Sequence, residues 1–472
     1  MKLTCNLCFL SVLVLCFSIE VRAQSTQSSY FMESVGARSL LNPALTPSQG
    51  YIGFPGLGNI YLDVKTNTLN PSHLMFSIDG DDVPFTDKRV AADEFLRDMA
   101  KDNYASINFD YSLFSAGWYS GKSFWSLNLG LKGFTDLNIP KGFFDLAKTG
   151  ADADISTEYD LSNLNAIGST FLEFGLGYSR KFLDDKLSLG VRGKALFGLA
   201  NLDLNVRQFG LRVDDTKWTT QTEIYMQAFA PGISIKYDEE GAFDKFDNNE
   251  TFSPAGYGYG VDLGAEYNLS HLAEIPFFDR IKISAAVTDL GLIRWNRNSS
   301  AALKAIGSGE FDSEDIIILP DDMDNDELGD QLGDQLENLK NVAKLTENQA
   351  ESHTTKLHTN VLLGIEYDLL PDKLSAGFLH TTRYAAYQNI SENTLSLNFQ
   401  PAKWFGLAGT YSFSHSKYDT FGLAMHLAPS VGVNLFLAAD YISSHVDSDF
   451  IPVKAEGVNF QLGITIPIGK RR

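Results

Sequence analysis

The sequence predicts an all-β protein and, within that class, a transmembrane antiparallel β-barrel of about fourteen strands, in a range of about 12–16. Three observations lead to this prediction. Apolar residues recur at every second position, tight turns alternate with long polar connections, and no run after the N-terminus reaches the length of apolar residues that a membrane-spanning helix needs.

The alternation is clearest between residues 357 and 469. Leu395, Leu397 and Phe399 alternate with small polar residues, which indicates an extended backbone with one apolar face. The connection at Pro371 is tight, whereas the one at 443–456 is long and polar. Short turns at one end and long loops at the other are typical of an outer-membrane barrel. A soluble all-β fold is the alternative, but it gives no reason for this asymmetry.

The same pattern runs through the earlier part of the chain. With about seven strands after residue 357, the earlier segments bring the count to about fourteen. This count requires that Asn59–Lys65 is not a wall strand and that Trp218–Phe229 and Ile233–Tyr237 extend above the membrane. If the latter two segments are wall strands, the count rises to about sixteen. The earlier strand-like segments are His73–Asp79, Tyr104–Trp118, Ser123–Phe134, Ile167–Arg180, Leu187–Val206, Tyr259–Asn268 and Ile281–Trp295.

The N-terminus predicts export to the outer membrane. Lys2, an apolar core and Val21-Arg22-Ala23 are typical of a cleaved secretory signal peptide over residues 1–23. All three cysteines lie within it, so the mature chain is expected to have no disulfide, thiol nucleophile or cysteine metal site.

Four further regions follow the signal peptide. We interpret the turn-rich residues 24–70 as a plug or hatch, residues 71–469 as the barrel with an acidic extracellular loop at 296–355, and residues 470–472 as a basic tail. In the plug, Asn42, Pro43, Ala44 and Pro55 are the candidate functional residues. A plain tight turn explains Asn42-Pro43 equally well.

Charged residues also occur on the polar face of the predicted strands. Facing lipid near the midplane, a basic one would cost about 2–4 kcal/mol, so we expect them to face the lumen. A solvated inner wall is favoured over catalysis. The candidates are Asp110, Lys132, Glu173, Arg192, Lys194, Asp262, Glu266, Lys282 and Glu366.

Other chemistry is disfavoured. The formal charge of −21 argues against nucleic-acid binding. No phosphate-binding loop or catalytic motif occurs, so we expect neither an enzyme nor a cofactor. The Asp322-x-Asp324-x-Asp326 stretch resembles the start of a calcium loop but lacks its glycine, and a solvated acidic loop is the simpler interpretation, with no metal site.

An ordered set of segments resembles a Bacteroidota outer-membrane family of unassigned function, related to FadL-type and PorV/PorP-type barrels. The resemblance covers nearly the whole mature chain. It implies that Asn42-Pro43-Ala44 belongs to a luminal hatch. The segments are Ser39–Leu45, Gly53–Ile60, Asp262–Tyr267, Thr288–Trp295 and Gly364–Tyr367.

The functional expectation is a monomeric barrel, surrounded by outer-membrane lipid, that binds or passes a small ligand, with a hydrophobic ligand as the first candidate. The alternative is a scaffold or assembly partner of a secretion or surface complex. A membrane hydrolase is the third and least favoured interpretation, because no Ser–His pair with suitable placement is evident.

Overall fold

The computed structural model describes the chain in eleven stretches, and the predicted signal peptide, the acidic residues 313–344 and the basic tail lie outside them. Described are 26–78, 81–149, 157–214, 217–237, 243–248, 253–269, 278–312, 345–414, 420–428, 432–442 and 457–469.

The architecture is a closed antiparallel barrel with fourteen wall strands, as predicted. The last strand pairs with the first and so closes the ring. In ring order the wall strands are β1 (Gly50–Gly53) together with β2 (Ile60–Thr66), β5 (Asp102–Ser120), β6 (Ser123–Pro140), β8 (Asn165–Phe182), β9 (Leu187–Val213), β13 (Gly256–Asn268), β14 (Ile281–Trp295), β18 (Thr359–Leu370), β19 (Leu374–Tyr384), β20 (Asn389–Ala402), β21 (Phe405–Ser414), β22 (Thr420–Leu427), β23 (Asn434–Ile442) and β24 (Gly457–Ile468).

The period-two pattern sets the two faces of the wall. On β20, Leu395 and Leu397 are about half exposed on the outer surface, whereas Thr394 and Ser396 are buried inside. This arrangement inverts that of a soluble protein, because the apolar face is the exposed one. It is the arrangement expected of a wall surrounded by lipid.

The identity of the first wall strand corrects the sequence analysis. Asn59–Lys65 was expected off the wall, but β2 pairs with both β24 and β5. The segment expected in its place, His73–Asp79, instead contributes β3 (Met75–Ile78), which pairs only with β4 (Asp81–Pro84) in a separate hairpin. The predicted plug therefore ends near residue 49 rather than 70. Seven alternating residues do not distinguish a wall strand from a hairpin, which explains the error.

The first wall strand is interrupted between Gly53 and Ile60. On the β24 side, Phe54 and Leu57 still hydrogen-bond to Ile464. On the β5 side, the pairing stops at Ser112 and resumes at Ala116. Pro55 lies in this interruption and is exposed, so its predicted place in the plug is wrong.

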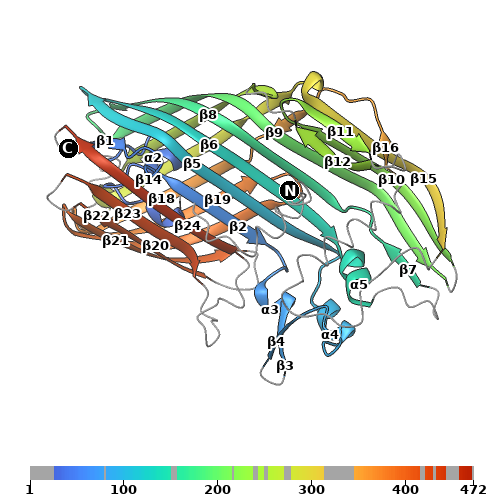
Figure 1. Cartoon of the computed structure of the whole chain (residues 1–472). Coiled ribbons are helices and arrows are strands. Elements are labelled where there is room, and N and C mark those ends of the chain that lie inside the picture. The colour runs from blue at the N-terminus through green and yellow to red at the C-terminus, as the bar shows by residue number, and fades with distance from the viewer. Residues whose placement is uncertain are drawn as a thin grey trace.

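Short turns connect strands at the barrel end where the C-terminus lies, and longer excursions leave the opposite end (Figure 1). The excursions carry α3 (Pro71–Leu74), α4 (Ala92–Arg97), α5 (Lys141–Thr149), β7 (Thr157–Asp160), β10 (Lys217–Phe229), β11 (Ile233–Tyr237), β12 (Phe243–Asn248), β15 (Ser300–Asp312), β16 (Thr346–Glu347) and β17 (Thr354–Lys356), together with the 3-10 turn η3 (Arg297–Ser299). The 3-10 turn η2 (Phe278–Arg280) lies at the short-turn end, where Asn268 N donates to the Lys186 carbonyl oxygen.

Two of these excursions differ from simple loops. Strand β10 pairs with the outer part of β9 and with β15, so Trp218–Phe229 lies outside the ring, as the count of fourteen required. The predicted acidic loop at 296–355 contains a full strand, β15, in its described part. Among the described residues, no helix is long and apolar enough to cross a membrane.

Candidate functional site

Residues Thr26–Gln49, which we call the luminal segment, lie inside the barrel near its short-turn end (Figure 1). The segment contains η1 (Gln27–Ser29) and α2 (Arg38–Leu41). Its apolar side chains pack on the inner wall, where Tyr30 and Leu45 contact Leu362 and Leu379. Both ends are also held by hydrogen bonds, since Thr26 N donates to Gln461 Oε1 over 2.9 Å and Gln49 Nε2 donates to the Gly469 carbonyl oxygen over 2.8 Å.

The Asn42-Pro43-Ala44 turn docks against the wall through its backbone and one side chain. Asn42 Oδ1 accepts from Ala44 N at 2.9 Å and so closes the turn. Asn42 Nδ2 donates to the Tyr30 hydroxyl at 3.1 Å, and Ser188 Oγ on β9 donates to the Ala44 carbonyl at 2.8 Å. The turn is therefore tied both to the segment and to the wall.

Two wall glycines create the space for this turn. A Cβ at Gly264 would lie 2.0 Å from Asn42 Oδ1, and a Cβ at Gly190 would lie 2.3 Å from the Pro43 carbonyl carbon. Any larger residue at either position would push the turn away from the wall. The fit indicates a specific docking site for the luminal segment.

Six of the nine predicted lumen residues meet in one buried network. Lys132 Nζ lies 3.1 Å from Asp110 and 2.9 Å from Glu173. Lys194 Nζ lies 2.8 Å from Asp262, which also accepts from Arg192 at 3.1 Å. Buried charges of this kind are tolerated only when they are paired.

This network touches the luminal segment directly. Arg192 Nη2 donates to the carbonyl oxygen of Ser39, in α2, over 2.7 Å. Asp289, which the sequence analysis did not select, joins the network 2.6 Å from Lys194 Nζ. It has a positive φ of 58° within β14, opposite the shift in pairing between β13 and β14. Such bulges redirect side chains, and this one turns Asp289 toward the lumen.

The other three predicted residues lie nearer the short-turn end. Lys282 Nζ lies 3.8 Å from Glu366 and 3.1 Å from Glu33 of the luminal segment. Glu266 interacts electrostatically with Arg38 of the segment. Burial tends to raise the pKa of Glu33, but Lys282 and Arg38 outweigh it and the pKa is lowered.

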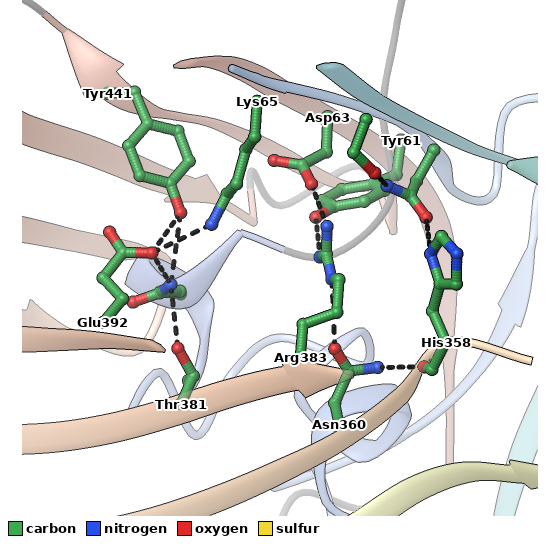
Figure 2. Close-up of polar contacts among 12 residues, drawn as sticks. Tyr61, Asp63, Lys65, His358, Asn360, Thr381, Arg383, Glu392 and Tyr441 are labelled. Carbon is green, nitrogen blue, oxygen red and sulfur yellow. Dashed lines mark hydrogen bonds and ion pairs between the residues drawn. The ribbon is translucent and has the colours of Figure 1, made fainter. Parts of the chain in front are cut away.

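A further set of polar residues, which the sequence analysis did not select, connects strands on different sides of the lumen (Figure 2). Arg383 on β19 is hydrogen-bonded to Asp63 on β2, and its Nε donates to Asn360 at 3.2 Å. Lys65 on β2 lies 3.0 Å from Glu392 on β20. Strands β21 to β24 separate these partners along the wall, so both ion pairs cross the lumen.

Glu392 connects the bridges to the luminal segment. Its Oε2 accepts from the Tyr441 hydroxyl at 2.5 Å and from Gln27 Nε2 at 2.7 Å. Tyr441 has a positive φ of 62° within β23. This conformation is rare for an aromatic residue and brings its hydroxyl to the lumen. A third contact across the lumen joins His358 Nε2 to Asp136 at 2.9 Å.

A cavity of about 80 Å³ lies between the luminal segment and these bridges. Since one water needs roughly 10–15 Å³ on this measure, the cavity holds about five to eight water-sized groups. Its lining includes Lys65, Lys132, Asp289, Arg383 and Tyr441, with aliphatic contributions from Leu40, Leu41, Leu362, Leu379 and Ile390.

A smaller cavity of about 30 Å³ adjoins the interruption of the first wall strand. It is lined by Gly58 and Asn59 of the interruption, by Ser115 on β5 and by Leu40 of the luminal segment. Lys132 and Asp110 line both cavities. The two spaces therefore meet at the same ion pair.

The ring of strands, the lipid-facing apolar surface and the polar, occupied lumen define a transmembrane β-barrel with an internal N-terminal segment. Residues 43–440 match the family model described as "Family of unknown function (DUF5723)". Because this match spans most of the chain, the protein belongs to that family. No curated protein matches the sequence.

Several solved structures resemble this chain at low identity. The Ralstonia pickettii toluene transporter TbuX has a TM-score of 0.43 and 9% identity, with 96% of each chain covered. The P. putida toluene transporter TodX has a TM-score of 0.41 and 8% identity, covering 92% of this chain and 94% of that one. A Pseudomonas aeruginosa FadL homologue has a TM-score of 0.43 and 9% identity, with coverage of 95% and 98%.

Proposed function

We propose that this protein is an outer-membrane barrel that binds a small ligand in its lumen and passes it inward when the luminal segment moves. The observation that carries the proposal is the cavity of about 80 Å³, which is bounded by the wall on one side and by Leu40 and Leu41 of the segment on the other. A ligand there contacts the element that blocks its way.

The side chains that line the cavity, and its volume, indicate which chemical class of ligand it can hold. Charged and aliphatic side chains share the cavity, and its volume suits about five to eight non-hydrogen atoms. A small amphiphilic or polar molecule fits this space better than a long hydrocarbon. The proposal includes export through a cleaved signal peptide and function as a monomer, and it assigns no catalytic step to the barrel.

Solute flux into proteoliposomes tests the proposal. The variant should lack residues 26–49 only, because the first wall strand begins with β1 at residue 50. We expect the deletion to increase the influx of small neutral solutes well above that of the full chain. A heat-dependent shift in gel mobility would verify that the variant is a closed barrel. Unchanged influx through a correctly folded variant would contradict the proposal.

A scaffold in a secretion or surface complex, of the PorV/PorP kind, is the second candidate. It is favoured by the sheet of β9, β10 and β15, which extends beyond the ring and encloses its own apolar core around Leu211 and Trp218. Purification from native membranes tests this alternative, which requires a partner in stoichiometric amount that is lost when β10 and β15 are replaced by a short loop.

A further inference from the structure

The two ion pairs that cross the lumen differ in which partner reaches the cavity. The side chains of Lys65 and Arg383 are 13% and 16% exposed, whereas those of Glu392 and Asp63 are 3% and 0% exposed. Both cations line the cavity and neither of these carboxylates does. A molecule in the cavity therefore meets the cationic side of each pair.

Both cations also keep hydrogen-bond donors beyond those they use. Lys65 Nζ has three N–H groups and one carboxylate partner, Glu392. Arg383 has five N–H groups and bonds to Asp63, Asn360 and Tyr61. The remaining donors are available to an acceptor that enters from the cavity.

We propose that Lys65 and Arg383 form a binding subsite for a small dicarboxylate, in which each cation keeps its internal partner, Glu392 or Asp63, and binds a ligand carboxylate with its remaining donors. The inference rests on the proposed function and names its substrate class. A ligand carboxylate makes the same charge-assisted hydrogen bonds as the internal one. Because each cation keeps its internal partner, binding leaves neither Asp63 nor Glu392 as an unpaired buried charge.

The spacing of the two sites favours two carboxylates in one molecule. Asp63, the partner of Arg383, and Lys65 are two residues apart on one face of β2, so their Cα atoms are about 7 Å apart. A four-carbon dicarboxylate has a comparable reach and about the size that the cavity admits. Leu362, Leu379 and Ile390, which line the same cavity, can pack on its methylene groups.

Calorimetric titration of the full mature chain in detergent tests the subsite with three probes of equal chain length: succinate, butyrate and succinamide. We expect succinate to bind at least about tenfold more tightly than butyrate, because the second carboxylate adds a charge-assisted contact. We expect no measurable binding of the neutral succinamide. Equal affinity for succinate and succinamide would overturn the proposal.

Replacing both members of an ion pair tests whether that pair binds succinate and leaves no buried charge unpaired. Lys65→Gln with Glu392→Gln should reduce succinate affinity about tenfold and leave butyrate within about twofold. The matched control is Lys122→Gln with Asp185→Asn, an exposed ion pair of 3.1 Å at a short turn, which should change neither affinity.

A second pair and the flux assay complete the test. If the first double variant does not fold, Arg383→Gln with Asp63→Asn serves the same purpose, and unaltered succinate binding in a folded variant would overturn the proposal. Influx of neutral solutes through the chain lacking residues 26–49 is independent of the subsite. Increased influx through this variant without succinate binding by the full chain rejects the dicarboxylate but retains the proposed function, whereas influx no greater than that of the full chain rejects the proposed function.

Discussion

Gly264→Ala should loosen the luminal segment while leaving the barrel closed. The new Cβ would lie 2.0 Å from Asn42 Oδ1 and 2.9 Å from Pro43 Cδ, whereas ordinary contact begins at 3.4 Å. The turn must therefore move by roughly 1.4 Å, the difference between 3.4 and 2.0 Å. Such a shift breaks the two bonds that dock the turn on the wall, from Ser188 Oγ to the Ala44 carbonyl oxygen and from Asn42 Nδ2 to the Ala285 carbonyl oxygen.

The size of the effect follows from these two bonds. At about 1 kcal/mol each, their loss weakens docking by about 2 kcal/mol. This corresponds to an increase of about thirtyfold in the undocked population. Hydrogen exchange followed by mass spectrometry should show the increase in peptides that cover residues 26–49.

The matched control is Gly193→Ala on β9, where a Cβ would meet nothing within 4 Å. It adds the same methyl group to a wall glycine on the outer face, so exchange in the luminal segment should stay at the wild-type rate. Equal exchange in the two variants, or no change in Gly264→Ala, would refute the docking argument.

Three further predictions concern the buried layers of the lumen. Lys132→Met leaves Asp110 unpaired and Glu173 with Lys194 alone, 3.7 Å away, and should cost about 3–5 kcal/mol, seen as barrel melting at a lower temperature on heated gels. Lys122→Met, at a side chain that is 58% exposed, should have no measurable effect. Trp295→Ala should cost about 3–5 kcal/mol, but Trp404→Ala, also 58% exposed, less than about 0.5 kcal/mol. The pKa of Glu33 is lowered when the luminal segment is docked, so its contribution to the stability of docking is complete above the ordinary glutamate pKa of about 4.3 and is lost as the pH falls. Bilayer conductance should therefore rise at acid pH. A Glu33→Gln variant that still showed the full rise would contradict this cause.

Periodicity and turn length predicted much of the wall because both reflect the physical constraints on a barrel. In each strand after residue 357, apolar and polar residues alternate, so one face must be apolar. The short turns all lie at one end of the barrel, so they determine the direction of each strand. The same reasoning failed at the first strand. The interruption after Gly53 divides it into two short pieces, β1 and β2, and neither is long enough to be recognised as a full wall strand.

The site was predicted only in part for related reasons. Tyr61, Asp63 and Lys65 already alternate with apolar residues in the sequence, and placing β2 in the wall would have directed them into the lumen. Asp289 and Tyr441 gave no comparable signal. Each has a left-handed backbone inside a strand. The resulting bulge shifts the alternation of inward and outward side chains, on which the prediction depends. Contacts across the lumen, such as Arg383 with Asp63, depend on the curvature of the ring, which local patterns do not encode.

Single-channel conductance in planar bilayers tests most directly whether the luminal segment closes the barrel. We predict that the full mature chain is mostly closed with brief openings, and that the chain lacking residues 26–49 shows larger and longer-lived conductance. Equal conductance of the two proteins, both shown to be folded barrels, would contradict the account.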